Sequence, residues 1–590
     1  MAPARFIRTG QNTLQRWVDD NLRAAVGLGD PIAGGQHAQT GGLPRREDGM
    51  NPPRFSWLSI SACVALGLAG ALPAAAQGPG FAPAAVGTKI ADGEAYATVV
   101  VLKHQSNAAD NGRMLLAYEA NNFDGIPIWE STDQGSSWHF VTNAKDPMVT
   151  DRPRCEMHWQ PHLTEMPRTQ HGIAAGTVLL SASTLCQQPP PGRGNERMFL
   201  RLFTSGDFGR SWNYVSTYAE APGAEPVWEP QLLILDDGSF VEFYSDEMHK
   251  REGYNQLLGH KVSKDGGKTW GPLVFDAANP GGVERPGMVI IDRLPDGRYV
   301  YNYEDVEGPV HMQVHLKFSK DGLHWGDPED RGTPVQTPSG RYPESTPNVF
   351  WFPVGGPKGI IAVTSRSLNG PGRDDNGNTI FWNNNLGVGP WWEAPTPVQK
   401  LGNSRAGWTQ ALVRLPDGQF LHVTSSASAD PARTRNSTAN EILFKVGPIN
   451  FNRYEAESAG QKGSAIMRDG SMSNGAKSRL GAKDVGKLSF PVHVASAGRY
   501  ELTVEFTGIG FDATPRLSVN GTLVAGSVTT APVNPARTAR RAVDLGTRGA
   551  GERKLLRVTA QLRAGDNAIE VLGGEYALDV DYLEVTPAGS

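Results

Sequence analysis

The chain has 590 residues, of which 39% are hydrophobic and 20% are charged, and its formal net charge is −5. A chain of this length normally forms two or more domains. Because the net charge is small and both signs are interspersed, the composition excludes a strongly basic nucleic-acid-binding or membrane-surface protein. The 69 glycines and 43 prolines have no collagen-like period, so they indicate many tight turns between short strands.

The first 76 residues have the pattern of a processed leader. Residues 1–49 are polar and Gly-rich, and Met50 begins a new pattern that contains Arg54, an apolar run over 57–72 and the exit PAAAQ. These are the three parts of a secretory signal peptide, here 50–76, cleaved near Ala76. We therefore expect Met50 to be the true start, residues 1–49 to be a disordered upstream segment, and the mature protein to be secreted, either extracellular or periplasmic.

A membrane span and a lipoprotein signal are the two alternatives to a cleaved signal peptide here. The apolar run is too short for a membrane span. The sequence from Ile60 to Cys63 also fits a lipoprotein-processing box, but the apolar run continues beyond Cys63, which favours ordinary cleavage over a lipid anchor. Export leaves Cys155 and Cys186 in an oxidising compartment, where both the disulfide and the free thiols remain open alternatives.

Four copies of one turn motif follow along the chain. Each reads Ser-x-Asp-x-Gly-x-x-Trp, with the last copy shortened, and the copies begin at Ser131, Ser205, Ser263 and Ser319. In such a turn the Ser and Asp side chains cap backbone N–H groups, and Gly takes the positive φ. The Trp then folds back onto the hairpin that it closes.

A second repeated motif alternates with the first. LDDG at 235–238 and LPDG at 294–297 and 415–418 each lie between two apolar runs, which predicts β-hairpins. Together the two motifs predict four strands per repeat and six repeats over residues 85–448, a six-bladed β-propeller. The Ser-x-Asp turn resembles the Asp box of the sialidase-like propellers. That resemblance implies the fold alone, because Asp boxes also occur in propellers that are not enzymes.

The residues that open the hairpins are the candidates for chemistry, because the inner strands of a propeller begin around its central channel. Two segments share one pattern, with Gln160 in WQPHL and Glu229 in WEPQL. Glu229 directly precedes an apolar run, so we expect it to be partly buried with a raised pKa, as a general acid requires. Gln160 indicates that a neutral side chain suffices for structure at the equivalent place. The alternative for Glu229 is an ordinary paired surface carboxylate.

Glu304, at the end of the strand-like run YVYNY, is the candidate partner of Glu229. Two carboxylates that converge beside aromatic platforms are typical of glycoside hydrolases. One of them protonates the leaving oxygen, and the other attacks the anomeric carbon or activates water. The candidate substrate-binding residues are Trp159, Gln160, Trp228, Asp246, Arg285, Tyr303, Glu344, Arg366 and Trp408.

The stretches Trp228–Glu247 and Arg285–Glu304 resemble glycoside hydrolase family 93, and the similarity extends over roughly residues 88–448. These enzymes are sialidase-like propellers that act as exo-α-1,5-L-arabinanases and release arabinobiose from arabinan. The resemblance implies that Glu229 is the acid/base and Glu304 the nucleophile of a retaining enzyme that needs no cofactor for catalysis. It also implies carboxyl groups about 5–5.5 Å apart.

Two further functions share this fold. A sialidase normally has an Arg-Ile-Pro segment near the first blade, whereas the segment GEAYATVVVLKHQSN at 93–107 contains no arginine. A non-catalytic glycan-binding protein would share every fold-level feature, and only the acid pair distinguishes it from an enzyme.

Residues 452–587 change to short alternating strands without a helical period, which predicts a β-sandwich of the jelly-roll type. The segments YEAE at 454–457, AGRY at 497–500 and Asp581-Tyr582 resemble carbohydrate-binding modules of families 6 and 35. The resemblance implies a structural Ca²⁺ with the oxygen ligands Glu455, Glu457 and Asp581. Solvated edge acids are the alternative.

Phe511 and Tyr576 are candidate sugar contacts of this second domain. We expect a monomer whose partner is a polysaccharide or oligosaccharide, and we expect neither a nucleic-acid nor a membrane partner.

Overall fold

The structure of the protein is a computed structural model that describes residues 85–120, 125–151, 154–188, 195–430, 433, 439–509, 513–531 and 550–588. The upstream segment 1–49, the signal peptide with Cys63, and Phe511 lie outside the described residues. All described residues belong to one compact unit, Pro83–Ser590. Within the described ranges, no helix has the length and apolar character needed to cross a membrane.

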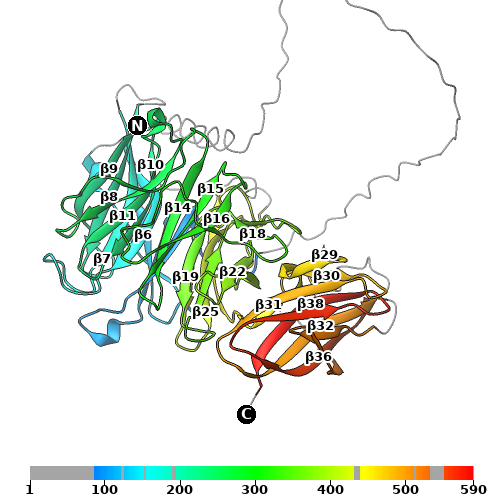
Figure 1. Ribbon diagram of the computed structural model, residues 1–590. Helices are drawn as coiled ribbons and strands as arrows, with labels where there is room; N and C mark the ends of the chain where they lie inside the picture. The colour runs from blue at the N-terminus through cyan, green and yellow to red at the C-terminus, as the bar shows by residue number, and fades with distance from the viewer. Residues whose placement is uncertain are drawn as a thin grey trace, which may run out of the picture. The chain divides into compact units, whose positions relative to one another are not determined.

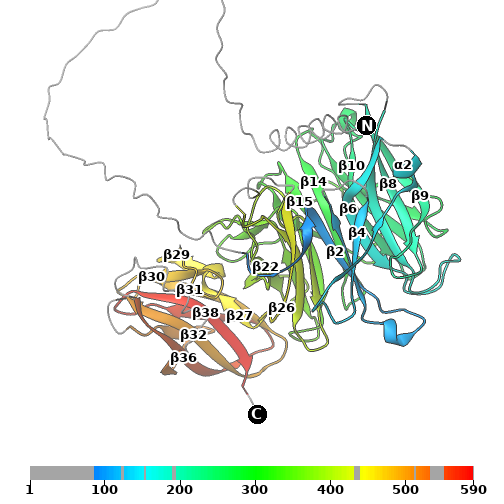
Figure 2. The same cartoon turned by 180° about the vertical axis from the view of Figure 1, so that it is seen from behind.

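The described chain is all-β, and its first part forms six antiparallel sheets in succession (Figures 1 and 2). The first three sheets have four strands each and run in chain order. They contain β2 (Ala95–Val101), β3 (Met114–Glu119), β4 (Ile126–Ser131) and β5 (His139–Ala144); β6 (Cys155–Glu165), β7 (Val178–Gln187), β8 (Glu196–Ser205) and β9 (Asn213–Pro222); and β10 (Val227–Ile234), β11 (Phe240–Asp246), β12 (Leu257–Ser263) and β13 (Val274–Ala277).

The fourth sheet is larger than the expected four-stranded unit. It contains β14 (Arg285–Arg293), β15 (Tyr299–Val306), β16 (Gln313–Ser319), β17 (Thr333–Pro334), β18 (Tyr342–Glu344) and β21 (Ser367–Asn369). The additional strands form because the connection after β16 returns along that strand, where Gln313 pairs with Glu344. The fifth sheet contains β19 (Asn348–Phe352), β20 (Ile360–Thr364), β22 (Thr379–Asn383) and β23 (Trp392–Pro395).

The sixth sheet joins the two ends of this region. It contains β1 (Thr88–Gly93), β24 (Gln410–Arg414), β25 (Phe420–Ser426) and β26 (Asn440–Gly447). β1 pairs with β26, from Thr88 opposite Phe444 to Gly93 opposite Asn440. A first strand that completes the last sheet is how a propeller closes its ring, so this order of sheets is consistent with a propeller.

Both turn motifs form as the sequence predicts. The Ser131 hydroxyl accepts the N–H of Gly135 at 2.8 Å, and Asp133 Oδ1 accepts the N–H of Ser137 at 2.9 Å. The copies that begin at Ser205 and Ser263 repeat these bonds. The LDDG and LPDG segments connect β10 to β11, β14 to β15, and β24 to β25, which confirms the predicted hairpins.

The second part of the chain forms two sheets. The seven-stranded sheet contains β27 (Arg453–Glu455), β29 (Ser464–Arg468), β30 (Ala476–Leu480), β32 (Gly498–Ile509), β35 (Ser527–Thr530), β36 (Ala550–Leu562) and β38 (Leu578–Pro587). The five-stranded sheet contains β28 (Gly460–Lys462), β31 (Lys487–Val494), β33 (Arg516–Val519), β34 (Thr522–Val524) and β37 (Gly565–Leu572). The short helices of the described chain are η1 (Ala108–Asp110), α2 (Pro147–Asp151), η2 (Lys250–Glu252) and η3 (Ala456–Ser458).

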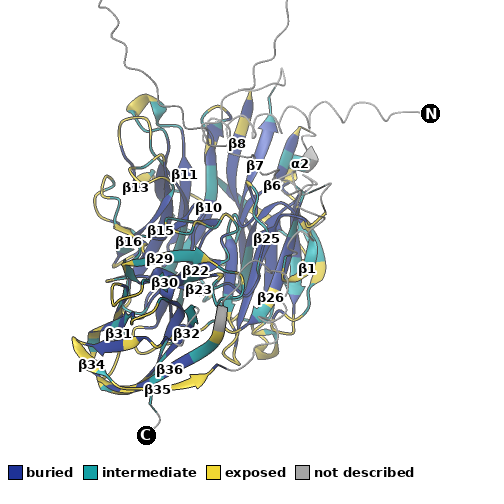
Figure 3. Cartoon of the chain, turned by 90° about the vertical axis from the view of Figure 1, so that its right-hand side faces the viewer, coloured by how far each residue is buried: buried dark blue, intermediate teal, exposed yellow. Residues whose placement is uncertain are grey.

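Most strands consist largely of buried residues, as Figure 3 shows, and β11 is buried along its whole length. The edge strand β35 is instead exposed along its whole length. One hydrophobic core includes residues from both parts of the chain. The ring centroid of Tyr454 lies 5.2 Å from that of Trp382 and 4.9 Å from that of Trp392.

Cys155 and Cys186 form a disulfide, which settles the alternative that the sequence leaves open. The two residues are directly opposite each other on β6 and β7, so the bond joins neighbouring strands of one sheet. A disulfide in a chain of this kind is consistent with secretion.

We predict that reducing this disulfide lowers the free energy of unfolding by about 3–4 kcal/mol, because a cross-link over this loop limits the entropy of the unfolded chain. Thermal unfolding with and without a phosphine reductant measures the loss. A double variant, Cys155→Ser with Cys186→Ser, should be as unstable as the reduced protein and should not respond to reductant. A wild-type melting temperature that reductant leaves unchanged would contradict the prediction.

Candidate active site

Four inner strands share the same irregularity near their first residues. On β2, β6, β10 and β14 the pairing register shifts at this point. At each shift lies one residue with a left-handed backbone, and these are Tyr96, Gln160, Glu229 and Met288, with φ of 55°, 53°, 61° and 62°. A positive φ is uncommon for residues other than glycine and costs free energy. Its recurrence in four successive sheets therefore marks a candidate functional site.

The four left-handed residues meet at one point, and we call them the four-strand cluster. The Tyr96 hydroxyl lies 3.3 Å from Glu229 Oε1, 3.5 Å from Gln160 Nε2 and 3.6 Å from Met288 Sδ. The backbone N–H of Met288 donates to Glu229 Oε2 at 2.9 Å. The register shift thus turns one side chain of each strand toward a common centre.

Glu229 is partly buried, and both of its carboxyl oxygens have polar neighbours. Its Oε2 accepts hydrogen bonds from the Met288 N–H and, at 2.8 Å, from the Ser245 hydroxyl, while Oε1 faces Tyr96. Burial, followed by the negative charge of Glu304, raises the pKa of Glu229 to about 7, although the hydrogen bonds act in the opposite direction. The group is therefore close to half protonated at neutral pH, which suits a general acid.

Glu304 lies on β15 and is buried. The N–H of Thr346 donates to its Oε2 at 2.5 Å. Burial raises the pKa of Glu304, and this rise is opposed by the bonds from Thr346 and Ser345 and by the positive charges of Arg366 and Arg285.

Gly287 lies next to Glu304 in the sheet and close to the carboxyl group of Glu229. Gly287 pairs with Glu304 across β14 and β15. A Cβ atom added to Gly287 would lie 3.6 Å from Glu229 Oε2. The two carboxyl groups therefore lie close enough for the charge of Glu304 to act on Glu229. The separation of about 5–5.5 Å stays a prediction.

Three of the expected aromatic residues lie beside this cluster. The ring centroids of Trp159 and Trp228 are 6.1 Å apart, and those of Tyr96 and Trp408 are 5.6 Å apart. The Trp228 Nε1–H donates to Glu247 Oε1 at 3.0 Å, which fixes the orientation of that indole.

Arg285 and Arg366 act on Glu304 through their positive charges. The Nη2 of Arg285 donates to Glu247 Oε1 at 2.8 Å and to Gln256 Oε1 at 2.7 Å. The Nη1 of Arg366 donates to the carbonyl of Ser404 at 3.0 Å, and burial lowers the pKa of this arginine.

Glu344, Asp246 and Tyr303, three other predicted substrate-binding residues, form hydrogen bonds away from the two acids. Glu344 accepts bonds from Ser367 at 2.8 Å and Asn369 at 2.7 Å. Asp246 is buried, accepts the Met248 N–H at 2.7 Å, and has a pKa raised by burial.

Tyr303 packs in a hydrophobic core, where its hydroxyl donates to the carbonyl of Arg331 at 2.8 Å. Neighbouring residues of a strand point to opposite faces, which is why Tyr303 and Asp246 lie away from Glu304 and Ser245.

Sequence reasoning missed Tyr96, Ser245, Met288 and Thr346. Tyr96 could have been found by aligning the opening strands of all the repeats, although its segment lacks the Trp-x-Pro pattern. Met288 and Thr346 contribute backbone N–H groups, which have no signal in the sequence.

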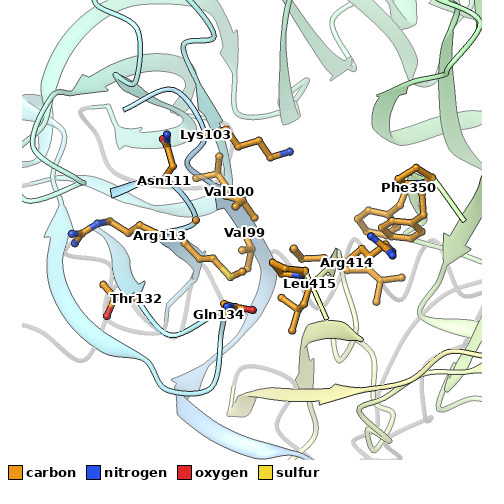
Figure 4. Close-up of a pocket in the computed structure, with 18 of the residues that line it drawn as sticks. Val99, Val100, Lys103, Asn111, Arg113, Thr132, Gln134, Phe350, Arg414 and Leu415 are labelled. Carbon is orange, nitrogen blue, oxygen red and sulfur yellow. The ribbon is translucent and has the colours of Figure 1, made fainter. Parts of the chain in front are cut away.

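A cavity of about 980 Å³ lies away from the two acids. It is lined by the far ends of inner strands, including Val101 of β2, Asp292 of β14 and Leu412 of β24. Figure 4 shows Lys103, Phe350 and other side chains around it. The residues that line this cavity include neither carboxylate of the candidate pair.

Glu455, Glu457 and Asp581 are buried, so the alternative of solvated edge acids is wrong. The Ser473 hydroxyl lies within hydrogen-bonding distance of Glu455 and, at 2.8 Å, of Asp581 Oδ1, and its single hydrogen can donate to one of them. Glu455 Oε1 and Glu457 Oε2 are buried without a hydrogen-bond partner in the described part of the chain. Burial is the largest cause that raises the pKa of Glu455 far above its usual range and that of Glu457 to about 7.

This donor set has the chemistry that suits calcium, which prefers carboxylate oxygens. However, among the described residues no group of three or more His, Cys, Asp or Glu side chains is arranged so that it could hold a metal ion. Calcium binding therefore stays a prediction.

No family model matches the sequence, and no curated protein matches it. Among solved structures, the α-L-arabinanase of Penicillium chrysogenum complexed with arabinobiose is 26% identical, with a TM-score of 0.51 over 62% of this chain and 99% of that chain. The GH93 α-L-arabinofuranosidase of Fusarium graminearum with arabinobiose is 24% identical, with a TM-score of 0.49 over 62% of this chain and 98% of that chain. The chain is thus similar in structure to glycoside hydrolases over 62% of its length.

From the resemblance to families 6 and 35 we predict that calcium stabilises the second part of the chain, because its two positive charges would offset most of the charge of three buried carboxylates. After treatment with a chelator, added calcium should raise the melting temperature, and a concentration one hundred times the dissociation constant stabilises by about 2.7 kcal/mol. Magnesium and the variant Asp581→Asn serve as controls, and both should give a smaller rise or none. A wild-type protein whose melting temperature does not respond to calcium after chelation would exclude the site.

Proposed function

We propose that the protein is a secreted, retaining, exo-acting glycoside hydrolase of the family 93 type. Its substrate would be arabinan or a related arabinofuranosyl polymer, from which it would release arabinobiose as an exo-α-1,5-L-arabinanase. The observation that carries the proposal is the pairing of Glu229, whose pKa is raised to about 7 by burial and by the charge of Glu304, with Glu304 itself. The similarity to the Penicillium α-L-arabinanase, solved with arabinobiose, supports the substrate class.

In the first step, a carboxylate oxygen of Glu304 attacks the anomeric carbon while the bond from that carbon to the glycosidic oxygen breaks. Glu229 gives its proton to the departing oxygen, so the leaving group departs as a neutral alcohol. In the second step, Glu229 accepts a proton from water, which attacks the anomeric carbon and releases Glu304. The Thr346 N–H and the charges of Arg285 and Arg366 support the ionised form of Glu304 that the first step requires.

The substrate would lie against the aromatic residues beside the acids. Trp159, Trp228 and Trp408 offer apolar surfaces for the sugar faces, while Arg285 and Arg366 offer N–H donors for hydroxyl groups. Glu344, Asp246 and Tyr303 are engaged with neighbouring groups, so we do not propose them as direct substrate contacts.

The whole chain would combine a six-bladed propeller over residues 85–448 with a β-sandwich carbohydrate-binding module over 452–587. The two-sheet arrangement of the second part supports this division. Tyr576, which is 37% exposed, is a candidate sugar contact. Such a module would keep the enzyme close to its polymer and raise the effective concentration of chain ends. The disulfide supports secretion.

We predict that Glu229→Gln and Glu304→Gln each lower the rate of sugar release from linear arabinan at least about 100-fold, because each removes one partner of the acid pair. Product analysis by chromatography on arabinan and related polymers measures the rates. The matched control is Glu220→Gln, which replaces an exposed glutamate paired with Arg197 and should behave as wild type. Variants of the pair that retain full rates would refute the site, and a wild type that binds arabinan without releasing sugar would favour a glycan-binding protein.

We also predict a bell-shaped dependence of kcat/KM on pH. Glu229 must be protonated, so the rate should fall about tenfold per pH unit above its pKa of about 7. Glu304 must be ionised, so the rate should also fall as the pH drops below the raised pKa of that residue. Initial rates across the pH range give both limbs. A rate that keeps rising well above neutral pH would show that Glu229 is not the acid.

A further inference from the structure

Gln160 contacts Glu229 by two routes, one direct and one through Tyr96. Its Oε1 accepts the backbone N–H of Glu229 at 2.9 Å and the Ser183 hydroxyl at 2.9 Å. Its Nε2 lies 3.5 Å from the Tyr96 hydroxyl, which in turn lies 3.3 Å from Glu229 Oε1. Gln160 is buried, so these contacts are its hydrogen-bonding environment within the described part of the chain.

The backbone N–H of Glu229 sets the directions of the hydrogen bonds that join Glu229, Gln160 and Tyr96. The backbone N–H of Glu229 can only donate, so the amide atom that faces it must be the oxygen of Gln160. The amide nitrogen must then face Tyr96 and donate to its oxygen. The hydroxyl hydrogen of Tyr96 is left to point at Glu229 Oε1, because the other nearby acceptor, Met288 Sδ, is weak.

The two oxygens of Glu229 are therefore not equivalent. Oε2 already accepts the Ser245 hydroxyl and the Met288 N–H, and the latter cannot reverse its direction. Oε1 has one polar contact, from Tyr96, where Oε2 has two, so we place the added hydrogen on Oε1 when Glu229 is protonated. The contact from Oε1 to Tyr96 is long, so this oxygen is the one that is free to approach a leaving group.

We propose that Gln160 is a positioning residue that, through Tyr96 and the backbone of Glu229, fixes Oε1 of Glu229 as the atom that carries the transferable proton. This inference rests on the proposed function and adds a role for the neutral member of the Gln160 and Glu229 pair. A carboxylate at position 160 could accept the bonds from Glu229 and Ser183 but could not donate to Tyr96.

The charges around Glu229 come from three strands. Glu304 on β15 acts on it through its negative charge, Tyr96 on β2 contacts its Oε1, and Glu119 on β3 acts on Tyr96. A second negative charge at position 160 would oppose ionisation of Glu229, and loss of the Tyr96 hydroxyl would remove a donor that favours the ionised form.

The test compares Gln160→Glu and Tyr96→Phe with the wild type on two substrates. One is an arabinan oligosaccharide, whose departure needs a proton, and the other is a 4-nitrophenyl glycoside of the released sugar, whose leaving group departs without one. Both variants should lose about tenfold or more in kcat on the oligosaccharide and little on the aryl glycoside. The alkaline limb of the pH profile should move upward by about one pH unit.

Tyr301→Phe is the matched control. Tyr301 is fully buried, and its hydroxyl has no hydrogen-bond partner in the described part of the chain. Removing this hydroxyl should therefore leave kcat on both substrates unchanged. Equal losses on both substrates with an unmoved alkaline limb would mean that Gln160 and Tyr96 are only structural, and would overturn the proposal. Circular dichroism of each full-length variant verifies that it folds.

Infrared difference spectroscopy tests the role of Gln160 without relying on hydrolase activity. Subtracting the Glu229→Gln spectrum from that of the wild type isolates the Glu229 carboxyl band, whose titration needs no substrate. A wild type without hydrolase activity would overturn the proposed function. The Glu229 carboxyl band would still show whether Gln160 and Tyr96 affect the titration of Glu229. A Glu229 titration that is the same in wild type, Gln160→Glu and Tyr96→Phe would overturn the role of Gln160.

Discussion

The candidate site depends on one backbone constraint, the left-handed residue near the start of the inner strands. A regular strand alternates its side chains between two faces, so a shift in pairing register changes which side chain of each strand points to a given side at this level. The register shift at Tyr96, Gln160, Glu229 and Met288 makes this convergence possible. Each such residue costs of order 1 kcal/mol or more, and the paired strands on either side must maintain it.

The surroundings of the two acids differ in a way that separates their roles. The pKa of Glu229 is raised by burial and by the charge of Glu304, and only hydrogen bonds oppose the rise. At Glu304, burial also raises the pKa, but Arg366 and Arg285 add positive charge that opposes it. Two carboxyl groups whose environments differ in this way can act as acid and nucleophile within the same pH range.

Local patterns in the sequence predicted much of the fold, because turn chemistry is local. The Ser-x-Asp turns and the Asp-Gly hairpins form where their residues indicate. The larger fourth sheet was not predictable, because the short strands β17 and β18 form by long-range pairing. The Cys155–Cys186 bond remained open because it depends on the register between two strands. In the site, Glu229 had a recognisable pattern, whereas the backbone donors of Met288 and Thr346 had none.

In the proposed mechanism, Glu304 attacks the sugar while Glu229 supplies the proton. The decisive experiment is to trap the covalent intermediate with a mechanism-based inhibitor built on arabinofuranose and to map the labelled peptide by mass spectrometry. We expect one added sugar per protein molecule, attached to the peptide that contains Glu304, and no labelling of Glu304→Gln. A label on another residue, or an active enzyme that never becomes labelled, would contradict this mechanism.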